Sequence, residues 1–160
     1  MGKRDKDRES PFSELHHVTI AVKDIEKVVK YYESIGIGPF KSFPPLSNFV
    51  KIEGKDKTAF YKYKVKEANI GPISLQLVQP PSNEESSYGE FLKRRSEGVQ
   101  HLGFVVDDIE KAETKLKELG LKVTETGRRS DGSGFTYFDT EEIGGVILEI
   151  RQNATKKEKE

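Results

Sequence analysis

The sequence of 160 residues lacks several residue types, and each absence excludes a class of function. It has no cysteine, which excludes a disulfide framework, a thiolate nucleophile and any zinc or iron–sulfur site built on cysteine. Its 27 basic and 27 acidic side chains balance, so no positive excess favours a nucleic-acid partner or a membrane surface. Its apolar runs, such as residues 18–22, have the length of strands and are too short to span a membrane. We expect a soluble cytoplasmic protein whose metal, if it binds one, has nitrogen and oxygen ligands.

Both ends of the chain are dense in charge and nearly without apolar side chains. Residues 1–12 and 153–160 cannot bury enough surface to become ordered, so we expect two disordered tails. The remaining residues, 13–152, are enough for one domain.

An internal repeat organises this domain. Residues 16–37 (HHVTIAVKDIEKVVKYYESIGI) align without a gap with residues 100–121 (QHLGFVVDDIEKAETKLKELGL), and seven of the 22 positions are identical. The shared positions include a D-I-E-K block, the histidines His17 and His101, and the glycines Gly36 and Gly120. A chance likeness between two strand–helix units would not place a histidine and a glycine in the same register, so we infer a duplicated module.

Each copy begins with an apolar strand that leads to an Asp N-cap, a helix and a glycine with positive φ. The caps are Asp24 and Asp108, and the expected linker helix at 84–98 begins with Ser87 and Glu90 as a capping box. Three strands follow each repeated helix, so each half reads βαβββ and the fold class is α+β. Module one spans 15–80 and module two 99–152. The expected strands are 48–53, 58–66 and 73–79 in the first half, and 121–126, 134–139 and 146–151 in the second.

The alternation of side chains along these strands predicts a site. In the first strand of each module the larger apolar residues face the helix, which places His17 and His101 on the opposite face beside small residues. In the last strands the same rule makes Gln76 and Glu149 equivalent and turns both away from the helices. His16 points to the other face, and we give it a structural role.

If the two halves of the sheet curl toward each other, His17, Gln76, His101 and Glu149 converge in one concavity. Two imidazoles, an amide oxygen and a carboxylate suit a divalent ion such as Co, Zn, Ni, Mn or Fe(II). A single strand histidine is more often a hydrogen-bonded core residue, and a single glutamate is usually solvated. The symmetry of the four positions favours the metal site.

At these residues the sequence resembles the vicinal oxygen chelate (glyoxalase, bleomycin resistance and dioxygenase) superfamily. The matching stretches are HHVTIAVKDIEKVVKYYESIGIGPF, ISLQLVQPPSNEESSYGEFLKRRSEGVQHLGFVVDDIEKA and FTYFDTEEIGGVILEI. The resemblance implies tandem βαβββ modules that form a curved mixed-sheet cup around a metal. Its His, Gln, His, Glu series is similar to that of methylmalonyl-CoA epimerases and their glyoxalase-like relatives.

The function implied is that of an isomerase or epimerase, which acts through a metal-stabilised enolate at a carbon next to a carbonyl or thioester. The substrate would be an acyl-CoA or a thiol adduct. Some epimerases carry an acid/base glutamate on the strand that we place at residues 58–65, which has no acid here, so Glu149 and Tyr137 are the candidates for proton transfer. Arg128, Arg129, Lys62 and Lys64 either contact a CoA phosphate or are merely solvated.

Three alternatives and one assembly question remain open. A lactoylglutathione lyase of the glyoxalase I type usually has glutamate at the position of Gln76. His17, His101 and Glu149 alone would form the triad of a non-haem Fe(II) dioxygenase. A metal-free module that binds a small molecule could use the same fold. We expect a homodimer, because paired modules expose strand edges, and the site could lie within one chain or between two.

Overall fold

The computed structural model describes residues 10–155, so residues 1–9 and 156–160 of the expected tails lie outside the described part. Phe12, which we assigned to the first tail, packs edge to face on Phe104 with 5.3 Å between the ring centroids. At the other end, the backbone N–H of Thr155 donates to the Asp131 carboxylate at 3.0 Å. The domain therefore includes a few residues that sequence composition assigned to the tails.

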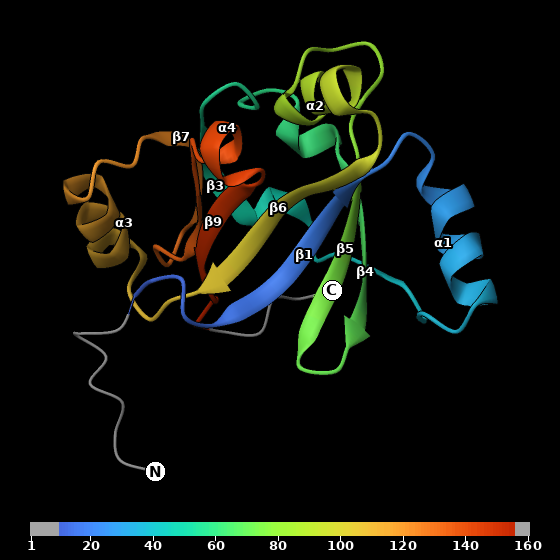
Figure 1. Ribbon diagram of the computed structural model, residues 1–160, viewed down its shortest axis with the longest axis horizontal. Helices are drawn as coiled ribbons and strands as arrows, with labels where there is room; N and C mark the ends of the chain where they lie inside the picture. Colours follow the sequence, from blue (N-terminus) through green and yellow to red (C-terminus); the bar gives the residue numbers. More distant parts are fainter. Residues whose placement is uncertain (1–9, 156–160) are drawn as a thin grey trace.

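The fold is a single curved mixed sheet of nine strands with few helices, so the expected α+β class is confirmed (Figure 1). The strand order is β2-β4-β5-β1-β6-β9-β8-β7-β3. At its centre β1 runs antiparallel to β6, and each pairs in parallel with the last strand of its own module, β5 or β9. The strands are β1 (Leu15–Ala21), β2 (Lys41–Ser42), β3 (Phe49–Glu53), β4 (Lys64–Ile70), β5 (Ile73–Gln79), β6 (Gly98–Val105), β7 (Val123–Arg129), β8 (Gly134–Phe138) and β9 (Ile147–Gln152).

The two repeated helices begin where the sequence predicts. Asp24 caps α1 (Ile25–Ser34) and Asp108 caps α3 (Ile109–Glu118), each accepting from the backbone N–H three residues further on. Gly36 and Gly120 have φ of 96° and 97°, as expected of residues that end helices. The predicted cap of the linker helix α2 (Ser87–Arg95) is wrong, because Ser86 is the N-cap and the Ser87 hydroxyl bonds Asp56 instead. The short helices are α4 (Glu141–Gly144), η1 (Leu46–Asn48) and η2 (Phe60–Lys62).

The middle of module one differs most from the expectation. The strand predicted at 58–66 is wrong, since the chain forms η2 first and β4 begins only at Lys64. The strand at 49–53 exists, but it crosses to the far end of the sheet and pairs with β7 of module two. In module one the two-residue strand β2 pairs with β4. The corresponding position in module two is occupied by β7, which pairs with β8. One strand of module one therefore extends the part of the sheet formed by module two.

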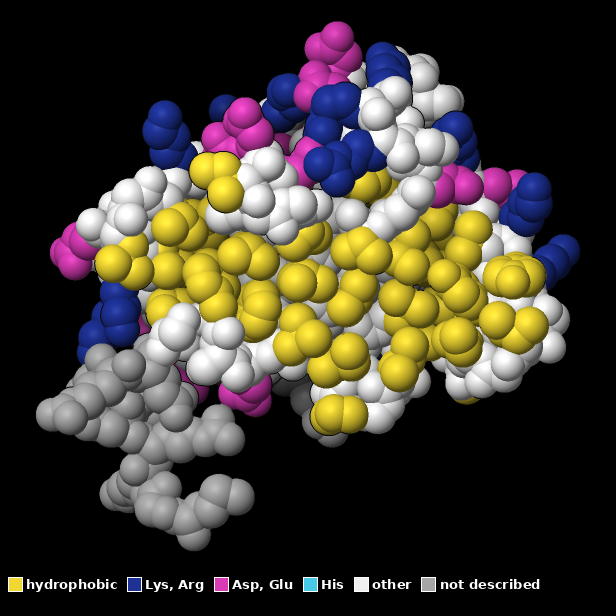
Figure 2. Space-filling model, in the orientation of Figure 1, with side chains coloured by type: hydrophobic (Ala, Val, Ile, Leu, Met, Phe, Trp, Pro, Cys, Tyr) yellow, Lys and Arg dark blue, Asp and Glu magenta, His cyan; other side chains and the backbone are white. Residues whose placement is uncertain are grey.

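The helices cover only the flanks of the outer face of the sheet. Side chains of α1 pack on Leu77 of β5, and side chains of α3 pack on Phe138 and Ile150 of β8 and β9. Between these helices the outer side chains of β1 and β6 form a broad hydrophobic band (Figure 2). None of the helices in residues 10–155 is long and apolar enough to cross a bilayer.

The inner face of the sheet is covered by the segment between β2 and β4. Its residues Phe49, Ile52, Ala59, Phe60 and Tyr63 form one buried cluster with Tyr88 and Phe91 of α2. This cluster lies on the same side of the sheet as His17 and His101 and closes the cup above them.

Candidate metal centre

Three of the four predicted ligands meet at one point beneath the aromatic cluster. The Nε2 atoms of His17 and His101 are 3.0 Å apart, and Glu149 Oε2 lies 2.9 Å from the first and 2.6 Å from the second. All three side chains are buried. Each residue presents one donor atom to a common centre, so these residues can hold a metal ion. All three residues come from one chain.

The register of the central strands brings these side chains together. His17 on β1 lies opposite Gly103 on β6, and Gly103 lies beside Glu149 on β9. Gly103 provides the space for the His17 ring, because a Cβ atom at this glycine would stand 2.0 Å from the Cε1 atom of His17. The position of the His17 ring therefore requires a glycine at residue 103 of β6.

The electrostatics of the cluster follow from burial and mutual attraction. Burial opposes ionisation of Glu149, yet the adjacent imidazoles outweigh it and hold the pKa of its carboxyl far below the ordinary value. Burial lowers the pKa of His17, which favours the neutral imidazole that a metal requires. The cluster therefore presents one carboxylate and two imidazole nitrogens, a donor set that suits a divalent first-row metal.

Further hydrogen bonds orient both imidazoles. The Nδ1 atom of His101 lies 2.6 Å from Oε1 of Gln100 and 3.3 Å from the hydroxyl of Tyr88. The Nδ1 atom of His17 lies 2.8 Å from Nδ1 of His16, which burial keeps neutral by lowering its pKa to about 3. The pairing of β1 with β6 shifts between Leu15 and His17, and His16 reaches its neighbour from this irregular position. Metal-binding histidines typically have such a partner on the second ring nitrogen.

Gln76 lines the same pocket but does not join the three converging residues. It is buried, its amide oxygen accepts from Thr19 Oγ1 at 3.3 Å, and its amide nitrogen donates to Glu67 at 3.5 Å. Glu67 is on β4, directly opposite Gln76 in the register of β4 and β5. This strand therefore does carry an acid, which the misplaced strand at 58–66 concealed.

Tyr137, a predicted catalytic residue, lies against the ring of His101 with 4.9 Å between centroids. Its hydroxyl is 3.3 Å from that of Tyr88, which in turn approaches His101. Burial raises the pKa values of both tyrosines well above the ordinary value, so both stay protonated. The two hydroxyls can therefore donate hydrogen bonds toward the pocket and toward each other.

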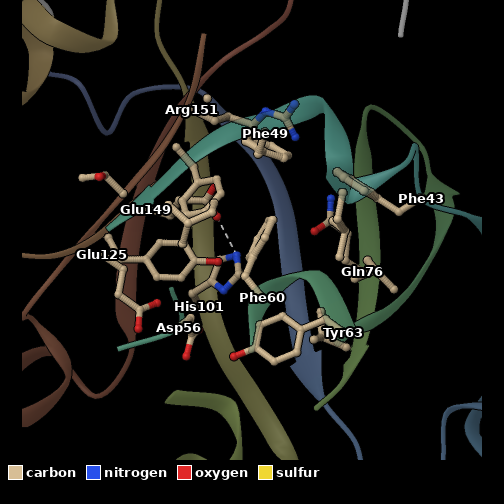
Figure 3. Close-up of a pocket in the computed structure, with 18 of the residues that line it drawn as sticks. Phe43, Phe49, Asp56, Phe60, Tyr63, Gln76, His101, Glu125, Glu149 and Arg151 are labelled. Carbon is tan, nitrogen blue, oxygen red and sulfur yellow. Dashed lines mark ion pairs between the residues drawn. The ribbon is translucent and has the colours of Figure 1, made fainter. Parts of the chain in front are cut away.

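The pocket around the three residues is mainly aromatic (Figure 3). Phe43, Phe49, Phe60 and Tyr63 line it from module one, and Phe135 and Tyr137 line it from module two. Such a wall excludes water and strengthens electrostatic interactions within the site. The polar groups that remain in the pocket are consequently those most able to direct a substrate.

The four basic residues considered for a phosphate have different surroundings. Arg128 faces outward and binds Glu110 and Glu113 of α3 at 3.0 and 2.8 Å, and Lys62 binds Glu84 at 2.6 Å. Lys64 is exposed. Only Arg129 faces the pocket, where its guanidinium lies 4.3 Å from the ring centroid of Phe49.

A pair of buried carboxyl groups, Asp56 and Glu125, forms another wall of the pocket. Asp56 accepts from the backbone N–H and the hydroxyl of Ser87 at 2.7 and 2.6 Å. Burial, and next the charge and hydrogen bond of Asp56, raise the pKa of Glu125 to about 9, against the opposing effects of the Ser87 hydrogen bond and the charge of Lys55. Glu125 is therefore a neutral hydrogen-bond donor near pH 7.

We expect the protein to lose stability as the pH rises from about 5 to 9. Folded Glu125 keeps a proton that the unfolded chain releases near pH 4.5, so its contribution is complete below that pH. Above it, the free energy of unfolding falls by at most about 1.4 kcal/mol per pH unit until the folded group titrates. Urea unfolding at pH 5, 7 and 9 should show a flatter slope for Glu125→Gln. An equal slope in both proteins would contradict the assignment. The control is Glu53→Gln, which changes an exposed residue of β3.

Several polar residues in or next to the pocket were not predicted as site residues: Asp56, Glu125 and Arg151 line the pocket, and Glu67 accepts a hydrogen bond from Gln76 beside it. Arg151 could have been found, because it lies two residues after Glu149 on one strand and therefore shares its face. Glu67 and Glu125 needed correct strand limits. Asp56 lies in an irregular segment, where alternation gives no information.

The fold and the site together define a class, a duplicated βαβββ domain whose central strands hold a His, His, carboxylate cluster in a curved sheet. The family model for the Glyoxalase/Bleomycin resistance protein/Dioxygenase superfamily matches residues 16–138. The chain belongs to this superfamily.

Individual relatives have narrower functions than the superfamily description, but their sequence identity to this chain is low. The chain is 25% identical to human mitochondrial methylmalonyl-CoA epimerase over 140 residues, which are 86% of this chain and 73% of the relative. Among solved structures, methylmalonyl-CoA epimerase from Mycobacterium tuberculosis is similar with a TM-score of 0.66 and 23% identity, covering 91% of both chains. A methylmalonyl-CoA epimerase in complex with methylmalonyl-CoA and NH4+ has the same TM-score at 24% identity, covering 90% of this chain and 96% of that one.

Proposed function

We propose that this protein is a metal-dependent epimerase that exchanges the proton next to the carbonyl of an acyl-CoA thioester. The observation that carries the proposal is the meeting of His17 Nε2, His101 Nε2 and Glu149 Oε2 within 3.0 Å of one another in a buried pocket. Co, Zn, Ni, Mn and Fe(II) all suit these donors. When bound, such an ion supplies Lewis-acid polarisation of the carbonyl oxygen.

Gln76 completes the proposed set of metal ligands. Its two hydrogen bonds, at 3.3 and 3.5 Å, are long and weak, so its amide oxygen can be released at little cost. Thr19, which donates to this oxygen, lies between Gln76 and His101 in the register of the sheet. We infer that, when a metal is bound, the Gln76 side chain turns its amide oxygen from Thr19 to the metal.

The substrate class rests on the relatives. The chain spans 73% of the human epimerase, and its fold matches an epimerase structure that contains methylmalonyl-CoA. The superfamily also includes glyoxalases and dioxygenases by its own description, so membership alone does not choose a reaction. We therefore take methylmalonyl-CoA as the first substrate to test.

An epimerase must remove a proton from one side of a carbon and return one to the other side. Glu67 on β4 and Tyr137 on β8 belong to opposite halves of the curved sheet, on the two sides of the metal cluster. We assign proton removal to Glu67 and proton donation to Tyr137, whose hydroxyl stays protonated because burial raises its pKa. Glu149 is held by both histidines, and its role is that of a ligand.

The test is hydrogen exchange in deuterated water. Protein loaded with Co²⁺ is incubated with (2R)-methylmalonyl-CoA, and deuterium at the α-carbon is followed by mass spectrometry. We expect rapid exchange, loss of exchange on chelation, and a rate lowered about 100-fold or more in Glu67→Gln. No exchange with Co, Mn, Ni or Zn would reject the epimerase. Turnover of the glutathione hemithioacetal of methylglyoxal instead would favour a lyase.

We also propose that the protein is a homodimer formed through the hydrophobic band of the outer face. The band is continuous and has few charges at its centre (Figure 2). Val18 of β1 and Leu102 of β6 lie opposite each other at its middle, and both are partly exposed. The repeat relates β1 to β6 by an approximate two-fold axis, and a two-fold dimer would pair this face with the same face of a second copy. The cytoplasmic location stays a prediction.

The dimer predicts a simple result. Light scattering should give twice the chain mass of 18.1 kDa for the wild type, and about one chain mass for Leu102→Lys, because a charge in the apolar centre opposes burial. Lys57→Glu, an exposed residue of the segment that covers the inner face of the sheet, is the control and should leave the mass unchanged. A monomeric wild type would contradict this interface. Metal binding should persist in Leu102→Lys, since one chain supplies the ligands.

A further inference from the structure

The two central strands each contain an irregularity just before their proposed metal-binding histidine. Residues 15 and 17 of β1 lie opposite residues 104 and 103 of β6, so His16 is an extra residue on β1. Residues 19 and 20 of β1 lie opposite residues 101 and 99 of β6, so Gln100 is an extra residue on β6. His16 and Gln100 are equivalent positions of the repeat. The duplicated module therefore has a β-bulge at the same place in both copies.

Both bulges bring the extra side chain to the neighbouring histidine. Strict alternation would place residue 100 on the face opposite His101. Instead Gln100 is 1% exposed, and its Oε1 atom lies 2.6 Å from Nδ1 of His101. In module one, Nδ1 of His16 lies 2.8 Å from Nδ1 of His17. Bulges can redirect a side chain beside a functional site, and each of these supplies a partner for the ring nitrogen that does not face Glu149.

The Gln100 side chain uses only one end of its amide group. Its oxygen contacts His101, whereas its Nε2 atom is buried and has no hydrogen-bond partner among residues 10–155. A buried donor without a partner lowers stability. An apolar side chain of similar shape would avoid this cost, so packing alone does not explain a glutamine at this position. What the glutamine contributes is the oxygen that it presents to His101.

The position of the His101 proton follows from the proposed metal centre. A histidine binds a metal ion through a ring nitrogen that carries no proton, and the nitrogen of His101 that faces His17 and Glu149 is Nε2. The proton of the neutral imidazole is then on Nδ1, which needs an acceptor. Gln100 Oε1 is this acceptor at 2.6 Å, and the Tyr88 hydroxyl is more distant at 3.3 Å.

We propose that Gln100 is a positioning residue, whose amide oxygen holds the proton of His101 on Nδ1 and so keeps Nε2 free for the metal ion. This proposal rests on the metal centre of the proposed function and adds a residue that acts only through a ligand. The hydrogen bond also fixes the orientation of the ring and makes Nε2 a stronger donor, as outer partners of metal-binding histidines do.

Two substitutions separate the oxygen from the rest of the side chain. Gln100→Met has a similar size and no oxygen, whereas Gln100→Glu keeps an oxygen acceptor and replaces the unpartnered amide nitrogen. Gln152→Met is the matched control, because Gln152 Oε1 accepts from the backbone N–H of Ile109 at 2.9 Å, where α3 begins. Competition with a chelator measures Zn²⁺ affinity, and circular dichroism of the metal-free proteins shows whether each variant folds.

We expect Gln100→Met to bind Zn²⁺ about 10-fold to 100-fold less tightly than the wild type, the usual effect of removing an outer partner. Gln100→Glu should bind Zn²⁺ as tightly as the wild type or more tightly, because it keeps the acceptor. Gln152→Met should have wild-type affinity. An affinity that falls as far in Gln100→Glu as in Gln100→Met, or that does not fall in Gln100→Met, would overturn the proposal.

Nitrogen NMR reports the proton position directly, because the chain has only three histidines. In Zn²⁺-loaded wild type labelled with ¹⁵N-histidine, Nδ1 of His101 should be protonated and Nε2 bound to the metal. The Nδ1 proton should exchange faster with solvent in Gln100→Met, whereas a purely structural role for Gln100 would leave this exchange unchanged. A metal-bound Nδ1 of His101 in the wild type would overturn the proposal, whether or not the variants fold.

These outcomes are distinguishable from a failure of the proposed function. A wild type that binds no Zn²⁺ would reject the metal centre together with the role of Gln100. Tight binding that is equal in the wild type and Gln100→Met would reject only the role of Gln100. The predicted order of affinities without hydrogen exchange in methylmalonyl-CoA would reject the epimerase and keep the role of Gln100.

Discussion

The His101→Ala variant is expected to bind Co²⁺ or Zn²⁺ more than about 100-fold less tightly than the wild type, because it removes one of three converging donors. Loss of an outer hydrogen-bond partner alone typically weakens metal binding by about 10-fold to 100-fold, and loss of a ligand should exceed that range. Titration with a competing chelator measures both affinities, and circular dichroism shows whether the variant folds.

His16→Ala provides a graded comparison. His16 is not a proposed ligand, and its Nδ1 atom lies 2.8 Å from Nδ1 of His17. Its loss should therefore lower the affinity for the metal ion by about 10-fold and leave the ligand set complete. The order of affinity is therefore wild type, His16→Ala, His101→Ala. Equal affinity in all three proteins would show that the cluster is a hydrogen-bonded core and not a metal site.

The Gly103→Ala variant is expected to lose both metal affinity and stability. The added Cβ would stand 2.0 Å from Cε1 and 2.4 Å from Nε2 of His17, so the imidazole must leave its place. Forced overpacking of this kind costs about 1 to 3 kcal/mol of the free energy of unfolding. Urea unfolding and metal titration of the same sample measure the two effects.

Gly98→Ala is the matched control, because it lies on the same strand β6 and a Cβ there would meet no atom within 4 Å. Its stability should change by less than about 1 kcal/mol, with metal affinity unchanged. Wild-type affinity in Gly103→Ala would mean that the His17 ring does not occupy the position described.

The repeat made the central part of the site predictable. His17 and His101 occupy one register position in two copies of a strand–helix unit, and alternation places both on the face away from the helices. Glu149 follows from the same rule on the last strand. These inferences need only local periodicity and the duplication, and the converging distances agree with them.

The sequence could not predict where module one departs from the repeat. Gln76 follows His17 by 59 positions, whereas Glu149 follows His101 by 48, and the additional chain forms β3 and η2 over the cup. No local pattern shows that β3 pairs with a strand of the other module, because pairing partners depend on the three-dimensional path. The aromatic residues at 60–63 favour a strand by propensity, but their contacts in the buried cluster stabilise a 3₁₀ turn.

The polar residues around the proposed ligands could not be predicted from the sequence either. Glu125 and Asp56 come from segments 69 residues apart and meet through Ser87. Arg129 was considered together with Arg128, yet alternation along β7 turns them to opposite faces. Strand limits correct to one residue would have separated the pocket arginine from the surface arginine.

Anomalous diffraction from a Co²⁺-loaded crystal, recorded on both sides of the cobalt edge, tests the metal centre most directly. The account predicts one strong peak per chain, bonded to His17 Nε2, His101 Nε2, a Glu149 oxygen and the amide oxygen of Gln76. A crystal that shows no peak among these residues, or a cobalt ion bound only elsewhere on the chain, would contradict it.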